Sequence, residues 1–165
     1  MGKYSSKKIN FIYIQSSKEV WAQELQKLYI KKISPYVNFK VVPLKSVNSE
    51  RHESARKVES ESSQILKKLE PTSLTWIFDE QGENLTSEAF ASELEKVFLD
   101  SSKRELNLVV GGAFGLSQTI KNQAHKKISL SSFVLNHHVA QAVVLEQLYR
   151  SFKIIHSESY HNGAV

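Results

Sequence analysis

The chain of 165 residues contains no cysteine, which excludes disulfides, cysteine-based zinc sites and a thiolate nucleophile. It also lacks an apolar run long enough to cross a membrane. Its polar, basic start is not followed by the apolar core of a signal peptide. A chain without cysteine fits a reducing compartment. We therefore expect a cytoplasmic protein with no membrane segment.

Several motifs of common catalytic sites are absent as well. The chain has no His-Glu-x-x-His pattern and no carboxylate spaced as a typical partner for its histidines, so we expect no metal site. It has no Gly-x-Ser-x-Gly pattern, which argues against a hydrolase. Gly111, Gly112 and Gly115 do not match the G-x-G-x-x-G spacing of a dinucleotide-binding domain.

The composition is that of a folded protein. With 41% hydrophobic residues the chain can fill a core, and its length predicts a single domain over residues 1–165. The formal net charge of +5 allows a polyanionic partner such as nucleic acid. The lysines are dispersed, however, and form no dense basic run. Charge alone therefore favours solvated helix faces over a nucleic-acid site.

Strand and helix patterns alternate along the chain. Short runs rich in apolar residues predict buried strands at residues 9–14, 39–44, 74–78, 106–110 and 128–130. Helices are predicted after a capping box at Ser16–Glu19, over residues 49–69, after Thr86, near Ser117 and over residues 138–152. This alternation predicts an α/β fold, a mostly parallel sheet with helices on both faces, and a ligand at the carboxyl ends of strands.

Two of the predicted helices have unusual surfaces. The helix over residues 49–69 is strongly polar with only a thin apolar stripe, which predicts that it is largely exposed; the stripe consists of Ala55, Val58, Ile65, Leu66 and Leu69. The last helix has a broad apolar surface, formed by Val139, Ala140, Val143, Val144 and Leu148. That surface is larger than one side of a sheet needs to cover, so it suggests packing against a second copy of the chain.

Three segments in the last third of the chain carry the strongest functional signal. The strand Leu108–Val110 runs into the glycine-rich segment 111–115, and glycine lets a ligand approach the backbone closely. A Ser-rich segment, Ile128–Phe133, and the sequence Asn136-His137-His138 follow. Taken alone, the glycines are better explained by a tight turn with nothing bound.

Taken in order, these segments resemble the C-terminal half of the bacterial pseudouridine N3-methyltransferases that act on large-subunit ribosomal RNA, within the SPOUT superfamily. The segments Trp76–Gly82, Thr86–Ala91 and Glu146–Arg150, with the ending Ser159–His161, follow in the order of that family. The resemblance implies a C-terminal trefoil knot, a homodimer and a pocket for S-adenosyl-L-methionine. It also implies transfer of a methyl group to N3 of a pseudouridine in 23S ribosomal RNA of the ribosome or its large subunit.

The resemblance also carries over site residues. The cofactor pocket would be lined by the end of the third strand, the glycine loop and the segment before the last helix, namely Phe78, Gly111, Gly112, Gly115, Leu130, Ser131, Ser132, Phe133, Val134 and Leu135. His137, Tyr160 and His161 are candidates for taking the proton from N3, because a neutral histidine accepts a proton near neutral pH. Arg150 would hold a phosphate or the base anion, although an ion pair with Glu146 explains it as well.

Three positions depart from the pattern of the resembled family. Asn136 stands in place of a proline, Gln141 in place of an arginine, and Phe114 in place of a polar or acidic residue. The loss of a fixed positive charge at Gln141 would weaken the binding of RNA. The alternative function is therefore a non-catalytic RNA-binding or ribosome-associated module that kept the fold.

Overall fold

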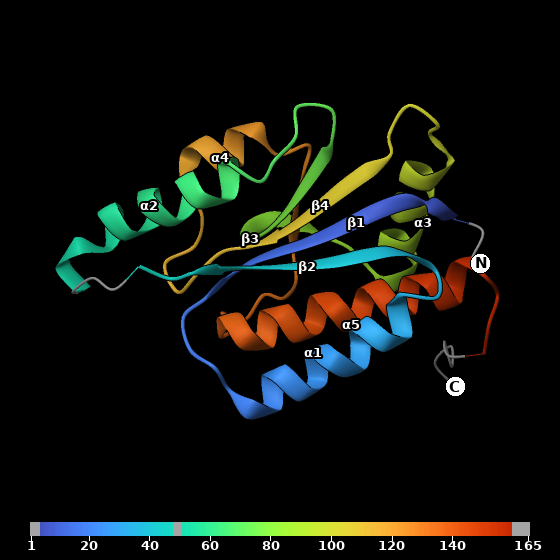
Figure 1. Ribbon diagram of the computed structural model, residues 1–165, viewed down its shortest axis with the longest axis horizontal. Coiled ribbons are helices and arrows are strands. Elements are labelled where there is room, and N and C mark those ends of the chain that lie inside the picture. Colours follow the sequence, from blue (N-terminus) through green and yellow to red (C-terminus); the bar gives the residue numbers. More distant parts are fainter. Residues whose placement is uncertain (1–3, 48–50, 160–165) are drawn as a thin grey trace.

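The structure, a computed structural model, describes residues 4–47 and 51–159 and is built around one five-stranded sheet (Figure 1). The strands are β1 (Tyr4–Gln15), β2 (Val37–Lys45), β3 (Leu74–Asn84), β4 (Glu105–Val110) and β5 (Lys126–Ser129). Their order across the sheet is β2-β1-β4-β3-β5, and all four neighbouring pairs are parallel. The predicted α/β class with a parallel sheet is confirmed.

Helices cover both faces of the sheet (Figure 1). One face carries α1 (Val20–Ile33), α3 (Ser87–Leu99) and α5 (His137–Ile155); the other carries α2 (Ser54–Leu66) and α4 (Gln118–Gln123). A short 3-10 helix, η1 (Arg51–Glu53), precedes α2. Thr86 caps α3 as predicted, since its hydroxyl accepts from the backbone N–H of Ala89. Helix α4 begins after Ser117, near the predicted start, and the Ser117 hydroxyl accepts from the backbone N–H of Ile120.

The alternation of side chains along β1 divides the core into two clusters. Ile9, Phe11 and Tyr13 belong to the larger cluster with α3 and α5, whereas Ile12 and Ile14 belong to the smaller one with α2 and α4. Because both faces are covered, the strands are apolar on both sides. Most of the apolar surface of α5 is used within the chain: Val144 and Leu148 are fully buried, and Val139 stays partly exposed.

The predicted capping box at Ser16–Glu19 is wrong. Helix α1 begins at Val20 after Glu19, and no side-chain hydrogen bond caps it. The hydroxyl oxygens of Ser16 and Ser17 lie instead 2.6 Å and 3.0 Å from the Nε2 atoms of His137 and His138. A tertiary contact across 121 residues has replaced the local one that the motif predicted.

Helix α2 is less exposed than its polar sequence predicts. Ala55, placed on the apolar stripe, is exposed, whereas Glu61 and Ser62 are buried. The Ser62 hydroxyl accepts from the backbone N–H of Ser117, at the start of α4. The polar face of α2 therefore packs onto loops at the carboxyl ends of the strands.

Strand β3 continues beyond the predicted turn at 79–82. Phe78 and Glu83 both pair with Ile128 of β5, so the residues between them form an irregularity in the register. A side chain at Gly82 would come within 2.5 Å of the backbone of Ile128. Glycine is therefore required for β5 to lie against this part of β3.

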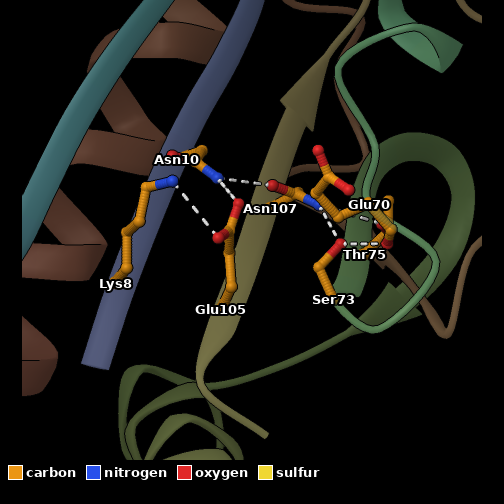
Figure 2. A network of polar contacts seen from close by, with 7 residues as sticks. All are labelled: Lys8, Asn10, Glu70, Ser73, Thr75, Glu105 and Asn107. Carbon is orange, nitrogen blue, oxygen red and sulfur yellow. Dashed lines mark hydrogen bonds and ion pairs between the residues drawn. The ribbon is translucent and has the colours of Figure 1, made fainter. Parts of the chain in front are cut away.

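At the other end of the sheet, polar side chains of β1 and β4 form a buried network (Figure 2). Asn10 Nδ2 donates to Asn107 Oδ1 (2.8 Å), and Asn107 Nδ2 donates to Ser73 Oγ (2.7 Å). Asn10 Nδ2 also donates to the carboxylate of Glu105, whose other oxygen lies 3.2 Å from Lys8 Nζ. The network joins β1, β4 and the turn before β3, where the apolar core ends.

We predict that Asn107→Ala lowers the free energy of unfolding by about 1–3 kcal/mol, because one N–H of Asn10 loses its acceptor and the Ser73 hydroxyl loses its donor within the buried network. The exposed Asn38 of β2 gives a matched control, for which Asn38→Ala is expected to change stability by less than about 0.5 kcal/mol. Urea unfolding of the three proteins measures both values. Equal costs for the two substitutions would contradict the role of the network.

Candidate active site

A cavity of about 560 Å³ lies at the carboxyl ends of the strands. Three segments form its wall: residues 78–81 within β3, residues 110–115 from the end of β4 onward, and residues 130–137, without Ser132, up to the first residue of α5. Lys121 and Ala140 complete the lining. The position is the one expected of a ligand site in a parallel sheet, and the volume is typical of small-molecule sites.

The glycine loop is held in a tight turn. Gly115 N–H donates to the Gly112 carbonyl at 3.0 Å, and Gly115 has a positive φ of 80°. A side chain at Gly111 would come within 2.9 Å of the Gly115 backbone. One at Gly112 would come within 2.7 Å of a carboxylate oxygen of Glu61, outside the cavity wall. Gly111 and Gly112 therefore permit the folding and packing of the loop itself.

Glu61 is the charged residue behind this loop. Only 2% of its surface is exposed. Its Oε1 accepts from the Ser46 hydroxyl (2.7 Å) and from the backbone N–H of Val47 (3.2 Å), whereas Oε2 has no partner among the described residues. Lys57 Nζ lies 4.0 Å from Oε1. Glu61 was not predicted as a site residue, since a glutamate in a polar helix gives no signal of burial.

His137 is the first residue of α5 and lines the cavity. Asn136 caps this helix, because its Oδ1 accepts from the backbone N–H of His138 at 2.9 Å. Burial lowers the pKa of His137, and the nearby charges of His138 and Lys57 lower it further. The imidazole is therefore neutral at neutral pH. It is held by the Ser16 hydroxyl, and the predicted role of a neutral proton acceptor fits this environment.

Two opposite charges meet on the wall of the cavity. Lys121 Nζ of α4 lies 2.8 Å from Asp79 Oδ2, and both residues line the cavity. Neither was selected from the sequence. The pair ties α4 to the irregular part of β3, and it leaves a carboxylate and an ammonium group at the edge of the site.

Most of the predicted cofactor residues come together in this cavity. They are Phe78, Gly111, Gly112, Gly115, Leu130, Ser131, Phe133, Val134 and Leu135. Ser132 does not line it. Phe133 is 82% exposed, so it lies at the rim of the cavity and is not enclosed by it.

The predicted catalytic residues are not all brought together at the cavity. Arg150 lies on α5 thirteen residues after His137, about 20 Å along the helix axis, and its guanidinium is 2.6 Å from Glu146. The ion pair between Arg150 and Glu146 that the sequence allowed is thus present. Within one chain, Arg150 is not brought to the cavity. Tyr160 and His161 lie outside the described residues.

Gln141 also points away from the cavity. It is 6% exposed and borders a small hollow beside Tyr13, Gln26 and His138. Its Nε2 atom has no hydrogen-bond partner among the described residues. In a single chain this position is therefore part of the interior between β1, α1 and α5, and it does not face the site.

Comparisons with known proteins agree with this architecture. A family model described as a predicted SPOUT methyltransferase matches residues 7–161. The chain belongs to the SPOUT methyltransferase family. A relative from Bdellovibrio bacteriovorus, named ribosomal RNA large subunit methyltransferase H, is 40% identical over 90% of this chain and 95% of its own. A relative of the same name from Syntrophotalea carbinolica is 37% identical over 79% and 83%.

Solved structures show the same fold at low sequence identity. A probable methyltransferase from Bordetella pertussis superposes with a TM-score of 0.60 at 13% identity, over 88% of this chain and 95% of that one. A probable methylase family protein from Haemophilus influenzae gives a TM-score of 0.56 at 12% identity, over 97% and 72%. The SPOUT assignment thus rests on the family model, and the solved structures show the same fold.

The described part of this SPOUT chain contains neither a cluster of metal-binding side chains nor a membrane-spanning helix. Over residues 4–47 and 51–159, no group of three histidine, aspartate or glutamate side chains is arranged to hold a metal ion. Over the same residues, no helix has the length and apolar character needed to cross a membrane.

We predict that Gly112→Ala costs about 1–3 kcal/mol of stability, because the added methyl group overlaps Glu61. The cost should fall when Glu61 is first replaced by alanine, since the overlap is then gone. Urea unfolding of the parent, both single variants and the double variant measures this coupling. If Gly112→Ala costs the same in both backgrounds, the close packing on Glu61 does not decide the cost.

We predict that His137 makes the folded protein less stable in acid. Because its pKa is lowered in the folded state, the unfolded chain binds a proton first as pH falls through the ordinary histidine range. The free energy of unfolding should therefore fall from pH 7 to pH 5 by less in His137→Gln than in the parent. His52→Gln, at an exposed histidine of η1, is the control. Identical pH profiles for parent and His137→Gln would contradict the prediction.

Proposed function

We propose that this protein transfers a methyl group from S-adenosyl-L-methionine to N3 of a pseudouridine in 23S ribosomal RNA. The observation that carries the proposal is the 40% identity, over nearly the full length of both chains, to a protein named ribosomal RNA large subunit methyltransferase H. The cavity at the carboxyl ends of the strands supports it, because all the residues expected to hold the cofactor except Ser132 line that cavity.

The cavity suits an adenosyl group with a short charged chain. Phe78, Leu130 and Leu135 give apolar surface for the faces of the adenine ring, and the loop backbones give N–H and carbonyl groups for its edge. When bound, S-adenosyl-L-methionine supplies an activated methyl group on sulfur. The protein then has to position the two substrates and hold the charges around them.

His137 is the proposed proton acceptor. N3 of the target base carries a proton that has to leave before or during methyl transfer. The lowered pKa keeps the His137 imidazole neutral and able to accept at neutral pH. Its Nε2 lies 2.6 Å from the Ser16 hydroxyl. That hydroxyl can either give up its hydrogen bond to Nε2 when the base binds, or relay the proton between the base and Nε2. Tyr160 and His161 remain proposed helpers.

The active form is proposed to be a homodimer. Within one chain Arg150 is remote from His137, so only a second copy can bring this guanidinium to the cavity. Apolar side chains stay exposed on α1 and α5, which pack against each other, namely Val20, Trp21 and Leu28 of α1 and Val139 of α5. We also propose that the chain forms the trefoil knot of its family around the loops of the cavity.

A folded part of the ribosome is the proposed substrate. The basic residues are scattered and few side chains are placed to read bases, so contacts with phosphates supply much of the affinity. We predict that labelled S-adenosyl-L-methionine transfers its methyl group faster to intact large subunits than to a naked hairpin carrying the same pseudouridine. Transfer should fall steeply as salt rises.

Measurements on the same purified protein test the dimer, the recognition of folded RNA and the alternative of a non-catalytic module. Sedimentation at micromolar concentration should show a dimer, and a monomer would argue against the shared site. Equal rates on subunits and hairpin would contradict recognition of the folded element. Binding of the cofactor with no transfer to either RNA would instead favour the non-catalytic RNA-binding module.

A further inference from the structure

Helix α2 places a lysine beside the cavity, at a position without an assigned role. The Lys57 ammonium nitrogen lies 5.8 Å from the centre of the Phe114 ring, within the range of a cation–π contact. Its charge is also close enough to His137 to lower the pKa of that imidazole. Phe114 and His137 both line the cavity, so Lys57 stands at the edge of the site.

The lysine is held there by the buried carboxylate. Its side chain is only 14% exposed, and its nitrogen lies 4.0 Å from Glu61 Oε1, one helical turn away. That distance is too long for a hydrogen bond, and the oxygen already accepts two others. A buried carboxylate needs a nearby cation, so Glu61 fixes Lys57 without using up its hydrogen-bond donors.

Phe114 presents an aromatic surface to the same site. Its side chain is 48% exposed although it lines the cavity, in a loop whose shape is fixed by Gly112 and Gly115. An exposed aromatic ring beside a cation is a typical arrangement for binding a nucleotide. The ring stacks on a base and the cation pairs with a phosphate.

We propose that Lys57 and Phe114 hold one nucleotide of the RNA substrate at the mouth of the cavity. The Phe114 ring stacks on the base, and the Lys57 ammonium binds a phosphate of the same nucleotide. This inference rests on the proposed function, because it assumes that RNA approaches this cavity. It gives Phe114 a binding role at a position where the resembled family has a polar or acidic residue.

The test measures the affinity of the protein for purified bacterial large ribosomal subunits at several KCl concentrations. Phe114→Leu should weaken binding roughly 5- to 100-fold at every salt concentration, because leucine keeps the apolar volume but cannot stack. Lys57→Gln should reduce the slope of log affinity against log salt by about 1, because one phosphate contact is lost. Phe114→Trp and Lys57→Arg should restore most of the binding.

Control variants separate this role from a structural one. Lys68→Gln, at an exposed lysine just after α2, and Leu99→Ala, at an exposed leucine at the end of α3, should bind as the parent does. Because Lys57→Gln leaves Glu61 unpaired, the variant Lys57→Gln with Glu61→Gln removes both charges and should show the same reduced slope. Calorimetric affinity for S-adenosyl-L-methionine should be unchanged in Lys57→Gln, Lys68→Gln and Leu99→Ala, because none of these residues lines the cavity.

Each other outcome overturns the inference. If Phe114→Leu and Lys57→Gln bind and methylate subunits as the parent does, the nucleotide is held elsewhere and the proposed function still stands. If Lys57→Gln weakens only the binding of S-adenosyl-L-methionine, the anion that Lys57 binds is the carboxylate of the cofactor and not a phosphate of the RNA. If Phe114→Leu changes the sedimentation of the protein, the ring belongs to a contact between two copies. If the parent binds neither subunits nor cofactor, the proposed function fails with it.

Discussion

The close approach of helix α2 to the glycine loop depends on the missing side chain of Gly112. Because no Cβ stands there, the Glu61 carboxylate lies directly against the loop backbone. The loop in turn forms one wall of the cavity, and Ser62 of the same helix accepts from the start of α4. The shape of the site thus depends on a helix that has no residue in its lining.

The parts of the fold that depend on local pattern were predictable. Apolar runs gave all five strands to within a few residues, except that β1 begins earlier and β3 continues past its predicted end. The cap at Thr86 followed from its hydroxyl at the start of a helical pattern, and the start of α4 near Ser117 was also predicted. The capping box at Ser16–Glu19 failed because a hydroxyl that caps a helix can equally serve a side chain brought close by folding, here His137.

The residues of the candidate site also divide into those that local sequence could predict and those that depend on tertiary packing. Residues on the three loops were predictable, since parallel strands bring their carboxyl ends to one edge and the resemblance identified which loops carry the cofactor. The burial of Glu61 was not predictable, because the sequence of α2 shows that the helix is polar but does not show which part of the fold it packs against. The remoteness of Arg150 from His137 was predictable, because thirteen residues of the predicted last helix span about 20 Å. The resemblance nevertheless carried both residues into one site, which the geometry of a single chain does not allow.

The order of the strands also has a consequence for folding on the ribosome. β1 lies between β2 and β4, and β3 lies between β4 and β5, so β4 alone joins the two parts of the sheet. Until residues 105–110 leave the exit tunnel, β1 has only β2 as a partner and β3 has none. The two parts of the sheet then join late in synthesis, through contacts between residues far apart in the chain, which is the slow class of folding event. A protein that is proposed to modify ribosomes therefore completes its own core only near the end of its synthesis, since the larger core cluster also includes Val144, Leu148 and Phe152 of α5.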